Sequence, residues 1–291
     1  MSKPTIAFIG TGVMGQSMAG HILDAGYPLI VHNRSRTKAE DLIARGAKWA
    51  ENSGEAAAAA GIVCTIVGFP NDVEEIYFGN SGILANTAAG TVLIDMTTSR
   101  PDLAIRIAEA AAAREALALD APVSGGDVGA RNGTLSIMVG GPREAYDQVS
   151  PIFELMGSNI VFQGGPGAGQ HTKMCNQIAI APGMLGVCEA LAYAKRSGLD
   201  QETVLESIAA GAAGSWSLSN LAPRIIAGNL DPGFYVKHFI KDLSIALSSA
   251  ESMGLDLPGL ALAKSMYERL AAAGGEDLGT QGLYRLYSSS T

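Results

Sequence analysis

Residues 5–15 read TIAFIGTGVMG, an apolar run that passes directly into a glycine-rich turn. The apolar run predicts a buried strand, and residues 16–25 carry apolar side chains at helical spacing. Strand, turn and helix in this order are the context in which G-x-G-x-x-G spacing binds a dinucleotide. The first glycine forms the turn, the second lets the backbone approach a pyrophosphate, and the third allows close helix–strand packing. We therefore expect a dinucleotide site at this helix N-terminus, made by Gly10, Gly12, Val13, Met14 and Gly15.

The loop after the second apolar run, residues 28–32, bears on the choice of dinucleotide. An acidic side chain here would bind the ribose hydroxyls of NAD, but the chain has the neutral Asn33 followed by Arg34. An arginine can pair with the additional phosphate of NADP, and Ser35 can donate a hydrogen bond to it. The alternative is an ordinary polar loop that caps the helix starting near Thr37. The loop favours NADP as the cofactor, with NAD as the second candidate.

Strand and helix patterns continue to alternate through the first half of the chain. This alternation predicts an α/β fold, with a mostly parallel, doubly wound sheet of the Rossmann type and helices on both faces. Ligands of such sheets lie beyond the carboxyl ends of the strands, so we expect the loops at Phe69-Pro70, Thr98 and Ser124 to line one crevice. Asp95 and Asp120 end strands and are expected to cap helices or order loops. The further strands are expected at residues 62–67, 91–94, 117–120, 135–139 and 159–162, with a helix at 142–155.

The second half shows only helical periodicity, punctuated by glycine and proline. We place the domain boundary in the glycine-rich run at 164–167, which gives a dinucleotide-binding domain of residues 1–164 and an all-α domain of residues 165–291 for substrate binding and oligomerisation. The helices are expected at residues 170–197, 201–210, 215–226, 236–253 and 260–273.

Residues 167–177, GAGQHTKMCNQ, place a lysine at the start of the first long helix of this second half. On a helix, Lys173, Asn176 and Gln177 share one face. A lysine among polar neighbours can give a proton to a carbonyl oxygen or take one from an alcohol. The alternative is a solvated surface lysine. The predicted domain junction favours the first interpretation, because ligand sites are common between domains.

Composition restricts the classes of partner. Apolar residues make up 47% of the chain and charged residues 16%, as in a globular enzyme. The net charge of −8 comes without a basic stripe, so nucleic acid is not an expected partner. No uninterrupted apolar run reaches the length of a membrane span, because Pro182 and Glu189 break residues 178–191. Three scattered cysteines and the absence of a signal-peptide pattern at residues 1–4 indicate the cytoplasm. We expect no metal in the site.

Four runs together resemble the β-hydroxyacid dehydrogenase family, which includes 3-hydroxyisobutyrate dehydrogenases, tartronate semialdehyde reductases and glyoxylate/succinic semialdehyde reductases. The runs are FIGTGVMG at 8–15, DAPVSGG at 120–126, GQHTKMCNQ at 169–177 and KDL at 241–243. The resemblance implies hydride transfer between a nicotinamide cofactor and a small carboxylate substrate, with Lys173 as the catalytic acid/base. It also implies that Ser124, Gly125 and Gly126 hold the substrate carboxylate and that Asn176 or Gln177 orients the substrate. Thr98 and Lys241 would contact the cofactor.

Some positions depart from the family pattern or leave alternatives open. Asn176 before Gln177 resembles the tartronate semialdehyde reductases, and residues 279–284 lack the Asp-x-Ser of many relatives. Arg131 either helps to bind an anionic substrate or lies on a surface loop, and Lys241 is alternatively a surface lysine paired with Asp242 or Glu251. The competing functions are a decarboxylating dehydrogenase of the 6-phosphogluconate type and a non-catalytic dinucleotide-binding module. The apolar helical half also predicts a homodimer or homotetramer.

Overall fold

The computed structural model describes residues 3–288, which form two compact units that meet between Lys173 and Met174. Met1 and Ser2, part of the segment expected to lead into the first strand without a signal peptide, lie outside the described residues. Residues 289–291 of the predicted second domain also lie outside them. The unit boundary falls within the long helix α9 (Ala168–Arg196), after the last strand of the first unit has ended at Gly164. The first turns of α9 thus belong to the unit that contains the sheet.

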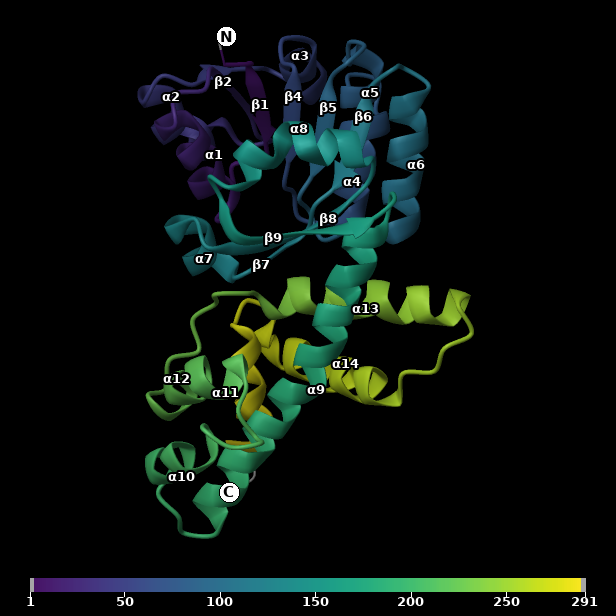
Figure 1. Ribbon diagram of the computed structural model, residues 1–291. Coiled ribbons are helices and arrows are strands. Elements are labelled where there is room, and N and C mark those ends of the chain that lie inside the picture. Colours follow the sequence, from purple (N-terminus) through teal and green to yellow (C-terminus); the bar gives the residue numbers. More distant parts are fainter. Residues whose placement is uncertain (1–2, 289–291) are drawn as a thin grey trace. The chain divides into compact units, whose positions relative to one another are not determined.

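The first unit is built on a sheet in the order β3-β2-β1-β4-β5-β6-β8-β7, with β9 paired to β8 (Figure 1). Strands β1 to β6 run parallel in their pairings, whereas β8 runs antiparallel to both β6 and β7. The order reverses at β1, since β2 lies on one side of it and β4 on the other. The strands are β1 (Ile6–Ile9), β2 (Leu29–His32), β3 (Lys48–Trp49), β4 (Ile62–Thr65), β5 (Val92–Asp95), β6 (Leu117–Asp120), β7 (Val123–Ser124), β8 (Leu135–Gly140) and β9 (Gly157–Gly164).

Helices cover both faces of this sheet, as the alternation of β1 requires. Ile6 and Phe8 pack into a cluster with side chains of α1, α2 and α8, while Ala7 and Ile9 pack into another with α3, α4 and α6. Figure 1 shows α8 lying over one face of the strands. The helices are α1 (Gly15–Asp24), α2 (Glu40–Ala44), α3 (Ser53–Ala58), α4 (Pro70–Phe78), α5 (Ile83–Asn86), α6 (Pro101–Ala112), α7 (Gly126–Asn132) and α8 (Arg143–Phe153), with a 3₁₀ turn at Arg36–Ala39.

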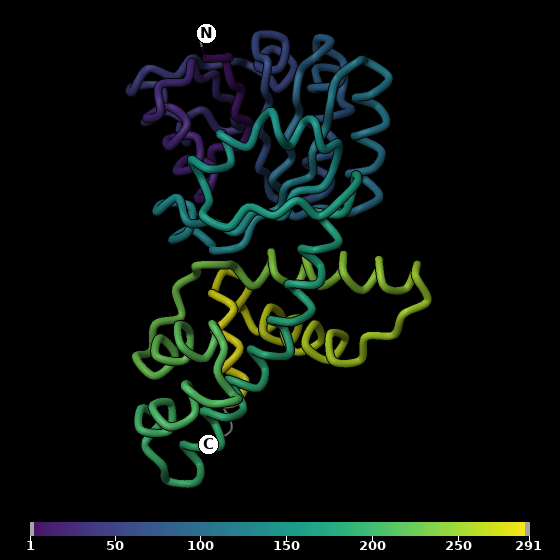
Figure 2. The backbone as a smooth tube through the Cα atoms, in the orientation of Figure 1, coloured from purple at the N-terminus to yellow at the C-terminus, as the bar shows by residue number. Residues whose placement is uncertain are grey.

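The second unit is helical, and Figure 2 shows its chain as a succession of coils. Its core gathers apolar side chains of α9, α13 and α14, among them Met184, Phe239 and Tyr267. The residues expected to form one helix at 215–226 form two short ones that meet at Leu221. The elements after α9 are α10 (Gln201–Ile208), α11 (Trp216–Asn220), α12 (Ala222–Ile226), α13 (Val236–Ser252), α14 (Pro258–Leu270), a π turn at Ala271–Gly275, a 3₁₀ turn at Thr280–Tyr284 and α15 (Arg285–Ser288).

Helix α9 is long and apolar enough to cross a membrane by length and composition alone, the one such helix among the described residues. This is weak support for a membrane span, because the core helix of a soluble protein passes the same test. The buried side chains of α9 include Ala181, Leu185 and Leu191, which belong to the core of the second unit. One side of α9 therefore packs in the core of the second unit.

The predicted Rossmann-type α/β half followed by an all-helical half is confirmed. Arg131 lies at the surface, as one of its two alternatives expected, but on helix α7 and not on a loop; its guanidinium lies 2.8 Å from the Asp127 carboxylate. That exposed pair, one helical turn apart, accounts for the arginine without a ligand.

Candidate active site

The glycine turn lies where the strand order reverses, the place at which open α/β sheets bind their ligands. Gly10 follows β1, and a Cβ atom there would meet the carbonyl oxygen of Ile66, just after β4, at 2.0 Å. A Cβ atom on Gly15 would lie 1.9 Å from the Gly10 carbonyl oxygen, so the first turn of α1 touches the strand end directly. Gly12 is different: a Cβ atom there would have no neighbour within 4 Å. Gly10 and Gly15 therefore pack against the protein backbone, whereas Gly12, the glycine expected to face a pyrophosphate, has free space beside it.

Asn33, at the carboxyl end of β2, ties the neighbouring loop to the glycine turn. Its side-chain oxygen accepts a hydrogen bond from the Thr11 backbone N–H at 3.1 Å, and its amide nitrogen donates to the Ser35 carbonyl at 2.9 Å. In the described part of the chain, the Thr11 hydroxyl is buried and has no hydrogen-bond partner. An unpaired buried hydroxyl is costly, which fits a place where a ligand supplies the partner.

Arg34 extends from the same loop into solvent, with its side chain 94% exposed. Its guanidinium lies 3.9 Å from the Asp72 carboxylate on α4, a separation at which a solvent-exposed pair contributes little. Ser35 and Thr37 share a hydrogen bond of 2.9 Å between their hydroxyls. Arg34 is thus accessible beside the turn, which is the arrangement that binding a 2′-phosphate would require.

The segments after β4 and β5 contain the other residues that are predicted to contact the cofactor. The Phe69 backbone N–H donates to the Asp72 carboxylate at 3.0 Å, and Pro70 begins α4, so this loop is fixed by the start of a helix. Thr98 lies just beyond β5 and is partly exposed. Phe69, Pro70 and Thr98 therefore follow the carboxyl ends of strands adjacent in the sheet, as expected for one crevice.

Lys173 is buried, only 6% exposed, and its Nζ donates to the backbone carbonyl of Val123 at 2.9 Å. Val123 precedes Ser124 in β7, and Gly125 and Gly126 follow with φ values of +130° and +62°, a region that favours glycine. The predicted acid/base and the predicted carboxylate-binding loop are thus brought together within the first unit. This placement excludes the alternative of a solvated surface lysine.

The remaining predicted contacts lie in the second unit. Gln177 is 1% exposed; its amide nitrogen donates to the Asp242 carboxylate at 2.5 Å, and its amide oxygen accepts from Asn176 at 2.7 Å. Lys241 Nζ lies 2.8 Å from the other Asp242 oxygen, the pairing expected as an alternative for this lysine. The Gln177 amide is thus engaged at both ends, whereas Asn176 is partly exposed. Asp242, part of the KDL run, was expected only as a partner of Lys241; its bond to Gln177 is an additional contact.

Two family models match consecutive parts of the chain. Residues 5–165 match the NAD-binding domain of 6-phosphogluconate dehydrogenase, and residues 167–287 match the NAD-binding domain of NADP-dependent 3-hydroxyisobutyrate dehydrogenase. An uncharacterized oxidoreductase of Bacillus subtilis is 61% identical over 98% of this chain and 99% of its own. The chain belongs to the β-hydroxyacid dehydrogenase family.

Two further relatives of this dehydrogenase carry specific names. The 3-hydroxyisobutyrate dehydrogenase of Pseudomonas aeruginosa is 38% identical and covers 96% of this chain and 98% of its own. A solved structure of the Mycobacterium tuberculosis 3-hydroxyisobutyrate dehydrogenase with L-serine has a TM-score of 0.90 and 29% identity, over 98% of this chain and 99% of that one. The match of the helical half to the 3-hydroxyisobutyrate model disfavours the decarboxylating alternative. The protein is an oxidoreductase with a nicotinamide dinucleotide cofactor.

A buried carboxyl at the end of β6, that of Asp120, has a raised pKa. Burial raises the pKa of Asp120 to about 6, while hydrogen bonds from the backbone N–H groups of Gln170 and Gly167 oppose the rise; the charge of Asp95 adds to it. Asp95 is the register partner of Asp120 in the neighbouring strand. The expectation that Asp120 caps a helix is confirmed, since Gln170 lies in the first turn of α9 and Gly167 directly precedes that helix.

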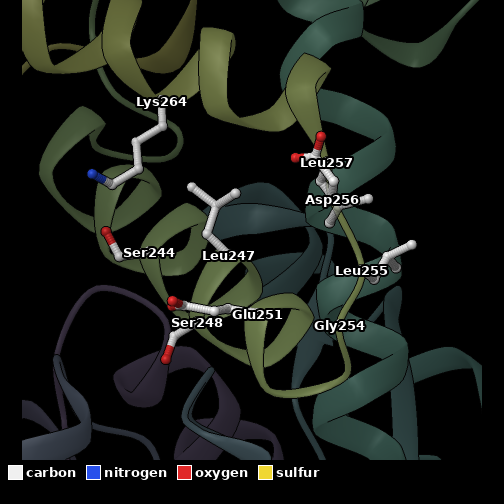
Figure 3. A pocket seen from close by; sticks show the side chains of 9 residues that line it. All are labelled: Ser244, Leu247, Ser248, Glu251, Gly254, Leu255, Asp256, Leu257 and Lys264. Carbon is white, nitrogen blue, oxygen red and sulfur yellow. The ribbon is translucent and has the colours of Figure 1, made fainter.

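The surface hollow in the second unit does not hold these residues. It has a volume of about 620 Å³ and lies between the end of α13 and α14, where Leu247, Glu251 and Lys264 are among its lining side chains (Figure 3). None of the predicted cofactor or substrate contacts of the dehydrogenase lines it. The hollow is therefore not part of the candidate active site.

Proposed function

We propose that the protein interconverts a small 3-hydroxy acid and its semialdehyde with NADP, using Lys173 as the general acid and base. The observation that supports this most directly is the 2.9 Å hydrogen bond from the buried Lys173 Nζ to the Val123 carbonyl, beside the Ser124-Gly125-Gly126 backbone. A buried lysine rarely persists without partners or a task, and this one lies next to a loop whose residues 124–126 are partly or fully exposed.

When bound, the nicotinamide donates or accepts the hydride. Gly10, Gly12 and Gly15 with the N-terminus of α1 would hold its pyrophosphate, since Gly12 is open and the Thr11 hydroxyl is unpaired. No metal is invoked in this mechanism.

The protein's own groups would position the substrate and move one proton. The backbone N–H groups of Ser124, Gly125 and Gly126 would bind the carboxylate, because glycine allows an anion to approach the main chain closely. In reduction, Lys173 would give its proton to the carbonyl oxygen as that oxygen gains charge; in oxidation, it would take the hydroxyl proton. Val123 restricts the lysine to one orientation while this happens. Asn176 would orient the distal part of the substrate.

A substrate screen tests the proposal as a whole. NADPH or NADH oxidation would be followed with glyoxylate, succinic semialdehyde and tartronate semialdehyde, and reduction of both oxidised cofactors with 3-hydroxyisobutyrate and L-serine. We expect turnover with at least one three- or four-carbon substrate that bears a carboxylate, and we expect reduction of the semialdehyde to need no carbon dioxide as a co-reactant. Cofactor binding without turnover on any of them would support the non-catalytic module instead.

The preference for NADP is proposed from the loop after β2. We expect Arg34→Ala to weaken NADPH binding about tenfold to a hundredfold, because a charge-assisted phosphate contact contributes roughly 1.5–3 kcal/mol. NADH binding should change less than twofold, because NADH has no 2′-phosphate. Both dissociation constants would be measured by titrating the nicotinamide fluorescence.

Arg45→Ala is the matched control for Arg34→Ala. Arg45 pairs with Asp24, the last residue of α1, and with Asp41 on α2, so it lies at the opposite end of α1 from the glycine turn. The control should leave both affinities unchanged. Equal losses for NADPH and NADH in Arg34→Ala would contradict a contact with the 2′-phosphate.

We further propose that the protein is a cytoplasmic homodimer or homotetramer that associates through α9. Exposed small or apolar residues follow one another along this helix: Ala179, Ile180, Gly183, Gly186 and Tyr193. The first four form one exposed patch, which the exposed Glu189 separates from Tyr193, and exposed apolar patches mark surfaces of association. The low cysteine usage of the chain, with Cys64, Cys175 and Cys188 all free in the structure, supports a reducing compartment.

Gly183→Arg tests this association. A Cβ atom at Gly183 would meet nothing within 4 Å, so the arginine is tolerated within one chain, but it would keep a second chain from approaching α9. We expect light scattering after size exclusion to show a smaller species than the wild type with unchanged thermal stability of the fold. Ala112→Arg, at another exposed small residue on α6, is the control and should not alter the mass. An unchanged mass in Gly183→Arg would exclude α9 as the contact.

A further inference from the structure

The end of β6 is joined to the first turn of α9 by a buried carboxylate. Asp120 is 4% exposed; its Oδ1 accepts from the Gly167 N–H and its Oδ2 from the Gln170 N–H, both at 2.8 Å. The first N–H groups of a helix have no partners within the helix. Here a side chain from a strand almost fifty residues earlier satisfies two of them. Asp120 therefore fixes the start of α9 to the sheet.

Gln170 provides a second connection in the same helical turn. Its side chain is fully buried; Oε1 accepts from the Ser99 N–H at 2.9 Å and Nε2 donates to the Thr97 carbonyl at 2.7 Å. The Thr97 hydroxyl in turn accepts from the Val67 N–H at 3.0 Å, after β4. The start of α9 is thus linked to the segments after β4 and β5 as well as to β6.

The backbone of α9 also touches the sheet at this point. A Cβ atom on Gly169 would lie 2.4 Å from the carbonyl oxygens of both Asp120 and Met138. A Cβ atom on Gly140, at the end of β8, would lie 2.6 Å from the Gly169 nitrogen. The helix therefore cannot shift along the ends of these strands without breaking the hydrogen bonds of Asp120 and Gln170.

Lys173 is one helical turn beyond these contacts, on the same rigid segment. We propose that Asp120 and Gln170 are positioning residues, which place the Lys173 amine at the Val123 carbonyl by fixing the first turn of α9 to the ends of β5 and β6. This inference rests on the proposed role of Lys173 as the acid/base. Neither residue needs to contact substrate or cofactor, and the effect on turnover passes through the lysine alone.

The first test measures the position of the lysine without using activity. The protein is treated with a limiting amount of an acetylating reagent, and acetylation of Lys173 is compared by mass spectrometry with that of Lys195, an exposed lysine at the other end of α9. Lys173 should be protected in the wild type. Its acetylation should be about tenfold faster in Asp120→Ala and Gln170→Leu, together with faster amide hydrogen exchange at residues 167–173. Asp120→Asn, which keeps one acceptor oxygen, should fall between wild type and Asp120→Ala.

The second test measures turnover on the best substrate of the screen. A displacement of about 1 Å can lower a rate on the order of a hundredfold. We expect kcat to fall about tenfold in Asp120→Asn and about a hundredfold in Asp120→Ala, with NADPH affinity within threefold of wild type. Asp147→Asn, an exposed aspartate on α8 paired with Arg143, is the control and should change neither measurement.

The two tests separate the inference from the proposed function. Unchanged protection of Lys173 in Asp120→Asn and Gln170→Leu would overturn the positioning role, whatever the rates. Full activity of a Lys173 variant, with the expected loss of protection in the Asp120 variants, would overturn the acid/base role and leave the positioning of the amine established. If Asp120→Ala does not fold, Asp120→Asn and Gln170→Leu still decide the question. A uniform rise of hydrogen exchange across the whole sheet would indicate a merely structural role and would also overturn the inference.

Discussion

Lys173→Met is expected to lower kcat about a thousandfold while NADPH affinity stays within a few-fold of wild type. Proton transfer by a positioned side chain contributes roughly 10²–10⁴-fold to a rate, and Lys173 is the buried amine beside the loop that we propose to bind the carboxylate. Methionine has a similar length and no proton to give. Single-turnover oxidation of bound NADPH would measure the chemical step, and fluorescence titration would measure the affinity.

Two further variants make this result specific to the proton. Lys173→Arg keeps a positive charge, but a guanidinium does not release its proton near neutral pH, so we expect it to be almost as slow as Lys173→Met. Lys195→Met removes an exposed lysine from the far end of the same helix and should be fully active. Turnover of Lys173→Met above a tenth of wild type would show that another group moves the proton.

Most of the fold was predictable because its elements follow simple patterns. Strands β1, β2, β4, β5 and β6 are short apolar runs that each end at a turn, and this is the signal of a buried parallel strand. The helices between them carry apolar residues at the spacing of one buried face. Both signals are local, so the printed sequence was sufficient.

Other elements carry no local signal. Strands β3 and β7 have two residues each, too few to show a period, and the antiparallel direction of β8 depends on its partners. The helix expected at 215–226 is divided at Leu221, because Pro223 lacks the N–H that a continuous helix would need near that point. One of the two alternatives for Arg131 placed it on a surface loop, but the glycines around it lie within α7 and at its ends.

Some features of the candidate site were likewise predictable from local sequence, and others were not. The glycine turn and Lys173 were predicted from motifs that are contiguous in sequence, and the structure brings Lys173 to Val123 as that interpretation requires. A capping role for Asp120 was expected, but its partners Gly167 and Gln170 and the contacts of the Gln170 side chain were not predictable, because they join segments far apart in the chain. The hydrogen bond between Gln177 and Asp242 was not predictable for the same reason, because the two residues lie on different helices. Contiguous motifs thus predict which groups react, whereas the polar contacts that position those groups join residues far apart in the sequence.

Substitution by alanine should have very different effects on stability at Gly12 and at Gly15. Gly12→Ala is expected to leave the free energy of unfolding within about 0.5 kcal/mol of wild type, because the new Cβ atom meets nothing within 4 Å. NADPH binding should nevertheless weaken about a hundredfold, since the methyl group would occupy the space through which the pyrophosphate reaches the backbone N–H groups. Losing two such contacts costs roughly 3 kcal/mol. Urea unfolding and NADPH titration would measure the two effects.

Gly15→Ala, in contrast, is expected to lower the stability of the fold. Its Cβ atom would lie 1.9 Å from the Gly10 carbonyl oxygen and 3.0 Å from Cγ2 of Ile66, so α1 has to move away from the strand end. Overpacking of this kind costs about 1–3 kcal/mol of stability, and the displaced helix N-terminus should weaken NADPH binding as a consequence. Of the three glycines, only Gly12 should lose NADPH binding without a loss of stability, because only at Gly12 does the protein leave room for a Cβ atom. Tight NADPH binding by a stable Gly12→Ala variant would mean that the dinucleotide does not lie over this turn.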